Sequence, residues 1–510
     1  METVTNLTLD LEATQADILA AACRRLGWRT NVVRTFVVLR RSLDARRKPA
    51  RWVYSVGLSR SVEQVPRYVP PKASPLPLPP VVVGFGPAGM LCALSLAESG
   101  LRPIVLERGL SVDERTRKVR DFWENGRLDT SCNVQFGEGG AGAFSDGKLN
   151  TGTGNREMQR YVLETFVRFG APEDILVDAK PHVGTDKLAL VVKGIRERIV
   201  ALGGEVRFGE RVTDVLPVAG GVRLVTDKGA YDTAHAVLAI GHSARGTYRM
   251  MEERGYRMES KAFAVGVRVE HLQADISRAL YGADYRNPLL PPADYKLVAH
   301  TAMGGVYTFC MCPGGYVVAS SSEEGTVVTN GMSYAARDGV NANAAVLVGV
   351  TPAMLGEDLW AGTRLQEEME RTAYRLGGGG YKAPVQLWGD FAKGRASHAF
   401  GRVQPTYRPG VEFARLDEAL PFDFAPAMRL AFESFGHKIK GYDAEDALLT
   451  GFETRSSAPV RILREDAFTA VGNPCVYPCG EGCGYAGGIM SAATDGLKVA
   501  ERIALAANGR

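Results

Sequence analysis

The chain has 510 residues, of which 45% are hydrophobic and 23% are charged, and its formal net charge is +4. This length is too great for a single hydrophobic core, so two or three domains are expected. The small net charge argues against a polyanion as partner of the whole molecule. No apolar run reaches the roughly 18 residues of a membrane-spanning helix, so no membrane association is expected.

Two further features bear on location. Residues 1–6 have neither the basic nor the apolar region of a signal peptide, so no export signal is expected. Eight cysteines in a chain of this length do not form a disulfide framework. We therefore expect reduced thiols and a cytoplasmic protein.

Residues 1–65 are expected to form a small α+β domain. Residues 13–26 predict an amphipathic helix that ends at Gly27. Residues 31–39 and 51–58 alternate apolar and polar side chains as strands do.

A basic run, residues 40–48, separates these two strands. We favour a solvated loop, and the alternative is a docking surface for an acidic partner or a nucleic acid. Residues 66–80 are rich in proline, which removes hydrogen-bond donors and favours extended chain. They predict a semi-rigid linker between the first domain and the next.

Residues 81–109 have the order strand, glycine turn, helix, strand and acid. Gly84 would allow the tight turn, Gly86 would let a pyrophosphate approach the backbone, and Gly89 would let the helix pack closely on the strand. The N-terminus of that helix favours phosphate groups. Glu107 ends the second strand, where a carboxylate meets a ribose hydroxyl in dinucleotide-binding folds. The stretch predicts a dinucleotide site.

A second GxGxxG sequence spans residues 137–142. The polar run 129–133 precedes it and residues 144–147 follow it, so it has neither the strand nor the helix that such a motif needs. We expect no second dinucleotide fold.

The rest of the chain is expected to complete this domain and add another. Helices and strands alternate up to residue 254, and this alternation predicts a mostly parallel sheet. Helices are expected over residues 115–125, 156–169 and 186–202, and strands over residues 205–208, 221–226 and 234–240. Residues 255–461 contain short strands, which predict a mixed or antiparallel sheet that faces the substrate; they are 263–270, 297–301, 305–310 and 316–320, with a helix near 365–376. The first fold returns with a strand over 474–481, a glycine-rich turn and a helix over 491–507.

These motifs carry a resemblance. GFGPAG (84–89) with VLERG (105–109) resembles the FAD fingerprint of the glutathione-reductase-type flavoprotein superfamily, and residues 234–241 and 477–489 resemble its other FAD signatures. More narrowly, the whole chain is similar to a bacterial family of FAD-dependent dehydrogenases (NAD(P)/FAD-dependent oxidoreductases). The phrases that carry this similarity are residues 41–46, 136–149, 180–188, 266–271, 308–315, 330–333 and 453–462.

The resemblance implies an α/β protein. A Rossmann-like FAD-binding domain would comprise residues 81–254 and 462–510, with the substrate domain 255–461 inserted and the small α+β domain placed before it. Glu481 stands where the superfamily usually has Asp. The residues that the resemblance assigns to FAD are Gly84, Gly86, Pro87, Ala88, Gly89, Glu107, Arg108, Gly139, Gly140, Ala141, Gly142, Val212, Ala239, Gly241, Gly480, Glu481, Gly487, Gly488 and Ile489.

Four residues are candidates for catalysis. Arg268 and His271 lie in one expected strand, on opposite faces, so they form no ready-made triad with Glu270. Arg455 would hold a substrate carboxylate, and a structural ion pair is the alternative. Cys479 lies two residues before Glu481 and would be a flavin-proximal thiol; the alternative is a small buried apolar residue.

Other candidates have a similar standing. Cys479 forms one cluster of cysteines with Cys475 and Cys483, and Cys310 and Cys312 form another. Asp146 and Lys148 lie in the glycine-rich loop. No CxxC pair occurs, so no metal site is expected.

The sequence favours an FAD-dependent oxidoreductase, a dehydrogenase or reductase, that acts on a small molecule. Because a built-in NAD(P)H domain is not expected, electrons would come from the substrate or from NAD(P)H that docks transiently. One alternative is an FAD-dependent monooxygenase. The other is an RNA- or partner-binding flavoprotein recruited through residues 1–65. Nucleic acid is not the favoured partner, and the oligomeric state is open.

Overall fold

Strand β4 (Val81–Val83) lies at the centre of a parallel sheet. The computed structural model describes residues 1–46, 48–63, 66–150 and 154–509. Within them, every neighbouring pair in this sheet is parallel. The strand order is β22 (Val476–Pro478), β10 (Ala236–Leu238), β4, β5 (Ile104–Glu107) and β6 (Glu205–Phe208). Two distant parts of the chain thus build one Rossmann-like domain.

The two faces of this sheet pack against different structures. Val82 belongs to a core shared with helices, whereas Val81 and Val83 belong to a core on the opposite face. This follows from the alternation of side chains along a strand. The helices of the first face are α2 (Pro87–Glu98), α4 (Arg156–Arg168), α5 (Thr185–Ala201) and α13 (Ile489–Ala507).

The opposite face carries a separate antiparallel sheet, where the sequence analysis was wrong. Residues 221–226 were expected to continue the parallel sheet. They form β8 (Gly221–Thr226), which pairs with β7 (Val212–Val218) and β9 (Ala230–Thr233). The turn between β7 and β8 explains this, because parallel strands need a crossover of about a dozen residues. Helix α6 (Arg245–Glu253) packs on the same core.

Residues 258–462 hold a larger sheet, mixed and mainly antiparallel as the sequence predicted. Only β18 (Ala383–Leu387) and β19 (Val411–Phe413) are parallel neighbours within the described residues. The order continues from these two through β20 (Leu448–Glu453), β12 (Phe263–Leu272), β17 (Asn341–Val350), β14 (Gly304–Cys312) and β13 (Val298–Thr301).

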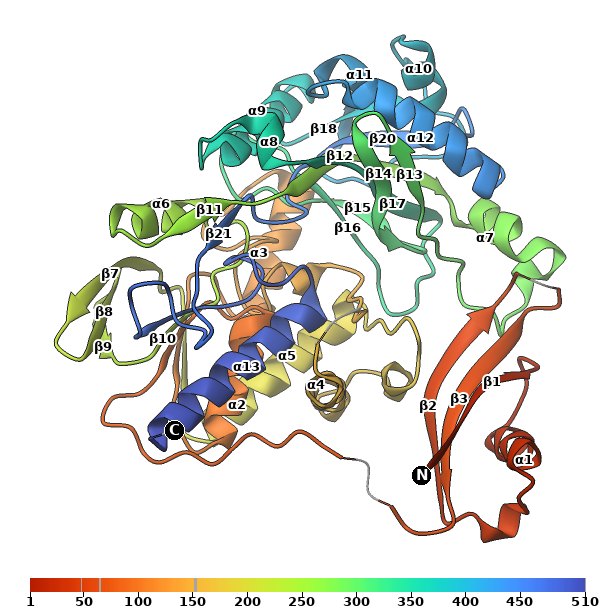
Figure 1. The fold of residues 1–510 in the computed structure, drawn as a ribbon. Helices are drawn as coiled ribbons and strands as arrows, with labels where there is room; N and C mark the ends of the chain where they lie inside the picture. Colours follow the sequence, from red (N-terminus) through yellow and green to blue (C-terminus); the bar gives the residue numbers. More distant parts are fainter. Residues whose placement is uncertain (47, 64–65, 151–153, 510) are drawn as a thin grey trace.

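Helices cover the outer face of this sheet, and a hairpin lies on its inner side (Figure 1). The hairpin is β15 (Tyr316–Ala319) with β16 (Thr329–Met332), and it lies toward the parallel sheet. The chain enters the domain at β11 (Met258–Ser260) and leaves at β21 (Val460–Ile462), and these strands pair with each other. The helices are α7 (Gln273–Tyr281), α8 (Pro352–Leu355), α9 (Ala361–Leu376), α10 (Trp388–Lys393), α11 (Leu416–Ala419) and α12 (Phe424–Lys438).

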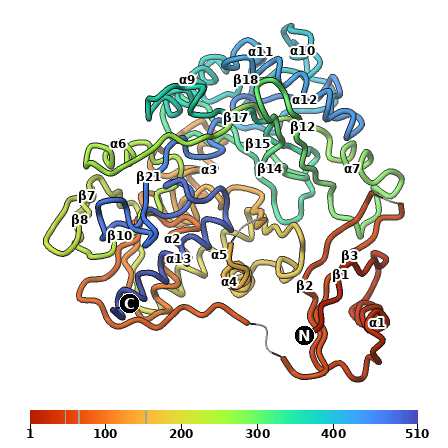
Figure 2. Tube along the Cα trace, viewed as in Figure 1, coloured from red at the N-terminus to blue at the C-terminus, as the bar shows by residue number. Residues whose placement is uncertain are grey.

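The N-terminal unit is one helix on a small antiparallel sheet. Thr14 caps helix α1 (Gln15–Leu26) by a capping box with Asp17, and Gly27 ends it in the left-handed conformation, at φ 66°. The sheet order is β1 (Glu2–Leu9), β3 (Arg51–Ser59) and β2 (Thr35–Asp44). Figure 2 shows residues 66–80 crossing from this unit toward the part of the molecule that holds α2 and β10.

The basic run was expected to be a loop, but residues 40–44 belong to β2. These residues pair with β3 despite their positive charge, because alternate side chains of a strand point to solvent and the charged groups can remain there. Residue 47 of this run, and the expected boundary at residue 65, lie outside the described residues. Among the residues described, no helix has both the length and the apolar character needed to cross a bilayer.

Strand β2 also attaches this unit to the rest of the molecule. The Arg41 N–H donates to the Val177 carbonyl at 2.7 Å, and the Ala179 N–H donates to the Arg41 carbonyl at 2.8 Å. The Arg41 guanidinium donates to Asp178 at 2.7 Å. The N-terminal unit therefore docks through backbone pairing and through ion pairs of Arg41 with Asp178 and Asp174.

Candidate active site

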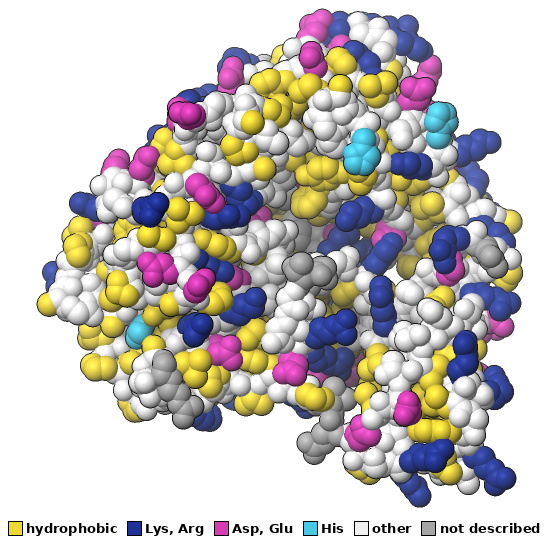
Figure 3. All heavy atoms as spheres, viewed as in Figure 1, with side chains coloured by type: hydrophobic (Ala, Val, Ile, Leu, Met, Phe, Trp, Pro, Cys, Tyr) yellow, Lys and Arg dark blue, Asp and Glu magenta, His cyan; other side chains and the backbone are white. Residues whose placement is uncertain are grey.

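A cavity of about 530 Å³ lies between the carboxyl ends of the parallel strands and the inner face of the larger sheet. Open α/β sheets place their ligands at this end of the strands. In Figure 3 the surface is hollowed near the middle of the view, with Lys and Arg side chains beside the hollow. Both sheets contribute to the lining, so each domain supplies one wall.

The turn after β4 forms the first part of the lining. Gly84 has φ 96°, and a Cβ there would lie 2.3 Å from the Ala239 carbonyl oxygen. A Cβ on Gly89 would lie 2.0 Å from the Gly84 carbonyl oxygen, so α2 approaches the turn as only glycine permits. Gly86 differs, because its nearest neighbour would be the Gly140 Cα at 3.6 Å. Its missing side chain leaves space open at the N-terminus of α2.

Glu107 holds this turn together. Its carboxylate accepts N–H groups from Phe85 at 2.8 Å and from Gly109 and Gly137 at 2.9 Å each. The residue is 5% exposed and lines the cavity. A carboxylate has about four acceptor positions, so capacity for one hydroxyl remains.

The glycine-rich loop after residue 136 lies over the turn. The Gly139 N–H donates to the Phe85 carbonyl at 2.8 Å, and a Cβ on Gly140 would lie 2.9 Å from the Gly86 Cα. The second GxGxxG sequence leads only into a short 3₁₀ helix, Ala141–Phe144, and not into an α-helix. The loop therefore closes one side of the first glycine turn.

The start of α13 forms the opposite side. A Cβ on Gly487 or Gly488 would meet no atom within 4 Å among the described residues, and both glycines line the cavity. A Cβ on Gly496 would lie 2.1 Å from the Ala88 carbonyl oxygen, so α13 packs tightly along α2. Two helix N-termini, each favourable for negative charge, thus open on the same cavity.

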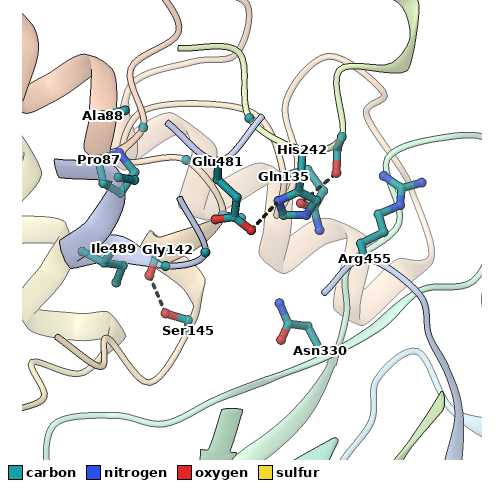
Figure 4. A pocket seen from close by; sticks show the side chains of 18 of the residues that line it. Pro87, Ala88, Gln135, Gly142, Ser145, His242, Asn330, Arg455, Glu481 and Ile489 are labelled. Carbon is teal, nitrogen blue, oxygen red and sulfur yellow. Dashed lines mark hydrogen bonds and ion pairs between the residues drawn. The ribbon is translucent and has the colours of Figure 1, made fainter. Parts of the chain in front are cut away.

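Glu481 and His242 form a pair in the lining (Figure 4). The Glu481 carboxylate lies 3.3 Å from His242 Nδ1, and a dashed line marks this contact. His242 Nε2 and Arg108 Nε are buried and have no partner within the described part of the chain. Buried polar atoms are normally paired, so these two indicate a polar ligand in the cavity.

These features fit an extended dinucleotide. Many of the residues that the family resemblance assigns to FAD line the cavity. They extend from Val212, Ala239 and Gly241 along the glycine turn to Glu481 and Ile489. Gly89, Gly139 and Gly480 stand behind this lining and shape it by close packing. Gly480 donates its N–H to the buried Asp495 at 2.8 Å.

Sequence analysis did not single out every lining residue; Gln135, Ser145 and Asn330 are among those it missed (Figure 4). Gln135 joins the two domains by a 2.6 Å hydrogen bond to the Ser320 hydroxyl. Ser145 and Asn330 lie within two phrases that carried the family resemblance, and that was the signal available for them.

Arg455 reaches the cavity but is held by a buried ion-pair cluster. Glu370, which is fully buried, accepts two hydrogen bonds from Arg455 and two from Arg245, at 2.8–2.9 Å. Burial raises the pKa of Glu370, but both guanidiniums outweigh it and hold that pKa well below its usual range. Arg245 belongs to α6 and Glu370 to α9, so the cluster fastens the two domains together.

The other catalytic candidates are placed differently. Cys479 lines the cavity, and burial raises the pKa of its thiol well above the usual range. Arg268 is fully buried behind the cavity wall and donates to both oxygens of Glu453. His271 lies away from the cavity, with Nε2 2.7 Å from the Tyr442 carbonyl oxygen, and burial lowers its pKa to about 4.

Asp146 and Lys148, in the glycine-rich loop, form an ion pair of 2.6 Å at the cavity. Arg337 also pairs with Asp146, which is fully buried. No group of His, Cys, Asp and Glu among the described residues has the arrangement of a metal site. All eight cysteines are free thiols.

The sequence of the chain matches families and relatives along its length. Residues 262–456 match a family described as FAD-dependent protein, C-terminal domain-like, and residues 1–59 match a domain of unknown function. A protein of Clostridium beijerinckii, described as uncharacterized, is 45% identical over 522 residues, which cover 98% of each chain.

Solved structures resemble the fold weakly. A flavin-dependent brominase is 12% identical, with 85% of this chain and 80% of that chain covered and a TM-score of 0.38. A geranylgeranyl bacteriochlorophyll reductase-like protein from Thermoplasma acidophilum is 11% identical, with 84% and 79% covered and a TM-score of 0.36.

Proposed function

We propose that this protein is an FAD-dependent oxidoreductase that acts on a small molecule. The chain belongs to the same family as the Clostridium beijerinckii protein, and residues 262–456 match the C-terminal domain of FAD-dependent proteins. One observation carries the proposal. The cavity is continuous from the glycine turn of the parallel sheet to the inner wall of the larger sheet. A cofactor on the first wall would therefore meet a substrate on the second.

The residues of the first wall would hold FAD. The N-termini of α2 and α13 favour its negatively charged groups, and Glu107 would accept a ribose hydroxyl. We also infer membership of the glutathione-reductase-type superfamily, since GFGPAG, the acid that ends β5 and the return of the chain at β22 occur together. When bound, FAD would accept an electron pair from one partner and pass it to another.

The second wall would bind and orient the substrate. Asn330 of β16 offers a hydrogen-bonding group there, and Ser145 and Lys148 of the glycine-rich loop line the same cavity. The charge of Arg455 is neutralised largely by Glu370, so we assign Arg455 to positioning the wall and not to holding a substrate carboxylate.

We favour a dehydrogenase or reductase over the alternative monooxygenase. No second glycine motif has the context of a built-in NAD(P)H fold, so NAD(P)H would dock transiently if it is the donor. The test is a visible spectrum of the purified protein, repeated after anaerobic addition of NADH and then of NADPH. Bleaching by either nicotinamide, with no product-coupled oxygen uptake, supports a reductase. Bleaching followed by oxygen uptake coupled to a hydroxylated product would replace it by a monooxygenase.

A nicotinamide-independent dehydrogenase predicts bleaching by an oxidisable metabolite instead. We do not extend the proposal to nucleic acid, because cations of the basic run are engaged within the protein. Arg46 pairs with Asp44, and Arg41 with Asp178. We place the protein in the cytoplasm on the strength of its free thiols.

A further inference from the structure

The loops that follow β10 and β22 meet at the carboxyl end of the parallel sheet. The last residues of the two strands are register partners, so both loops start at the same level. A Cβ on Gly482 would lie 2.4 Å from the Gly241 carbonyl oxygen, so the two backbones are in direct contact there. His242 and Glu481 are the chain neighbours of these glycines, and the contact between the loops brings their side chains together.

The Tyr248 hydroxyl fixes this contact. It lies 2.7 Å from the Gly482 carbonyl oxygen and 3.1 Å from the Gly241 carbonyl oxygen, one from each loop. Tyr248 belongs to α6 and is 1% exposed, and its ring packs in the core on that face of the parallel sheet. The two loops are therefore a rigid frame for the side chains that they carry.

The pair on this frame leaves one ring nitrogen of His242 without a partner. His242 Nδ1 lies 3.3 Å from the Glu481 carboxylate, and both residues line the cavity (Figure 4). An ionised carboxylate can only accept, so Nδ1 carries the hydrogen, and in the neutral ring Nε2 is then an acceptor. Nε2 is buried and has no partner among the described residues. Because buried polar atoms are normally paired, the ligand of this cavity is expected to supply the donor.

The strand order indicates which part of a dinucleotide would supply it. Strand β4 lies between β5 on one side and β10, followed by β22, on the other. The N-terminus of α2, which favours the diphosphate, follows β4, and Glu107, which would accept a ribose hydroxyl, ends β5. A dinucleotide that crosses the sheet in this direction would bring the group beyond its diphosphate to the loops after β10 and β22. In FAD that group is the ribityl chain, which bears several hydroxyl groups.

We propose that His242 binds the cofactor, with Nε2 accepting a hydrogen bond from a ribityl hydroxyl and Glu481 holding the ring through Nδ1. The proposal rests on the proposed function, since it takes FAD as the ligand. Glu481 is a positioning residue, because its carboxylate is engaged by His242 and acts on the cofactor through that ring. The ribityl chain carries the flavin ring, so this contact also helps to place the flavin ring between the two walls of the cavity.

The test compares two probes on the full-length protein freed of bound flavin. FAD has the ribityl chain, whereas ADP has the same adenosine and diphosphate without it. Isothermal titration calorimetry gives the dissociation constant of each probe for wild type and for His242→Asn, whose shorter side chain cannot reach the position of Nε2. His235→Asn is the matched control, because His235 precedes β10 as His242 follows it and, of the residues described, is not one that lines the cavity.

We expect His242→Asn to weaken FAD binding about tenfold and to leave the ADP dissociation constant unchanged, since only FAD loses a hydrogen bond. His242→Gln places an amide oxygen near the position of Nε2 and should recover part of the loss. His235→Asn should change neither constant. Glu481→Gln should weaken FAD binding in the wild-type background and add little in the His242→Asn background, because the acid acts through the ring.

Three results would overturn the proposal. An equal loss for FAD and ADP in His242→Asn would place the contact on the diphosphate or the adenosine. An unchanged FAD constant in His242→Asn would remove the contact altogether. Losses that add fully in the double variant would show that Glu481 does not act through His242. Circular dichroism of each variant establishes that it is folded. Failure of the proposed function is distinct from these results, because the wild-type protein itself would then bind no FAD.

Discussion

Glu370→Gln tests the buried cluster that fastens the two domains. The substitution keeps the shape of the side chain but removes the charge that Arg245 and Arg455 share. It also turns an NH₂ donor toward guanidinium groups that are themselves donors. The Glu370 carboxylate accepts a further hydrogen bond from the Thr454 hydroxyl at 2.8 Å, so five hydrogen bonds are affected.

The expected loss follows from the burial of all three charged groups. Glu370 is 0% exposed and the two arginines are each 7% exposed. Removing one partner from a buried ion pair costs about 3–5 kcal/mol, because the remaining charge is left uncompensated. Gln keeps one acceptor oxygen, so we expect about 3 kcal/mol of lost unfolding free energy.

Urea unfolding followed by tryptophan fluorescence measures this loss. Trp123 and Trp360 are suitable reporters, since Trp123 donates to the Ala319 carbonyl and Trp360 to Glu252, both across the domain boundary. Glu368→Gln, on the exposed side of α9, is the matched control and should change the unfolding free energy by less than about 0.5 kcal/mol. A Glu370→Gln variant as stable as this control would refute the reasoning.

The pH dependence gives a second check on the same variant. The pKa of Glu370 is depressed in the folded protein, so its contribution is present above the unfolded pKa, near 4.5, and is lost as pH falls through the folded pKa. The difference between wild type and Glu370→Gln should therefore be constant from pH 7 to 5 and shrink below about pH 4.

Further predictions concern the glycine turn and His271. Gly89→Ala places a Cβ 2.0 Å from the Gly84 carbonyl oxygen and should cost about 3 kcal/mol in urea unfolding; a cost under about 1 kcal/mol would contradict the close packing. Gly86→Ala meets only the Gly140 Cα at 3.6 Å, so it should keep the stability of the apoprotein and lose affinity for FAD at least tenfold, measured by fluorescence titration; unchanged affinity would remove Gly86 from the cofactor site. Burial lowers the pKa of His271 to about 4, so on acidification the unfolded chain takes up a proton on this residue before the folded protein does, and the free energy of unfolding falls between pH 6.5 and 4. His271→Gln should lessen this fall by about 3 kcal/mol. The same pH dependence of the unfolding free energy in variant and wild type would contradict the prediction.

The sequence predicted the dinucleotide half of the fold because local rules decide it. In residues 81–109, strand propensity, glycine positions and the helix N-terminus all favour the same structure, and that unit is present as β4, α2 and β5. The mixed character of the larger sheet was predicted from several strand patterns separated by loops, although β12 is longer than expected and its neighbour β17 was not predicted.

The errors occurred where partners decide the structure. Residues 221–226 have the pattern of any strand, and only the short turn before them selects an antiparallel hairpin. Strand β1 was missed because most of its residues are exposed and polar, and its pairing with β3 is a tertiary contact. The ion-pair cluster joins Arg245, Glu370 and Arg455, which are over 80 residues apart, and no spacing along the chain indicates that they meet.

The account depends most on the claim that the cavity holds FAD. The direct measurement is the visible spectrum of the purified protein, with the released cofactor identified by mass spectrometry and its amount compared with the protein concentration. We predict flavin absorption bands, FAD as the released compound and about one FAD per chain, with Gly86→Ala folded but depleted of flavin. A colourless protein that binds no FAD when the cofactor is added would contradict the assignment of this cavity.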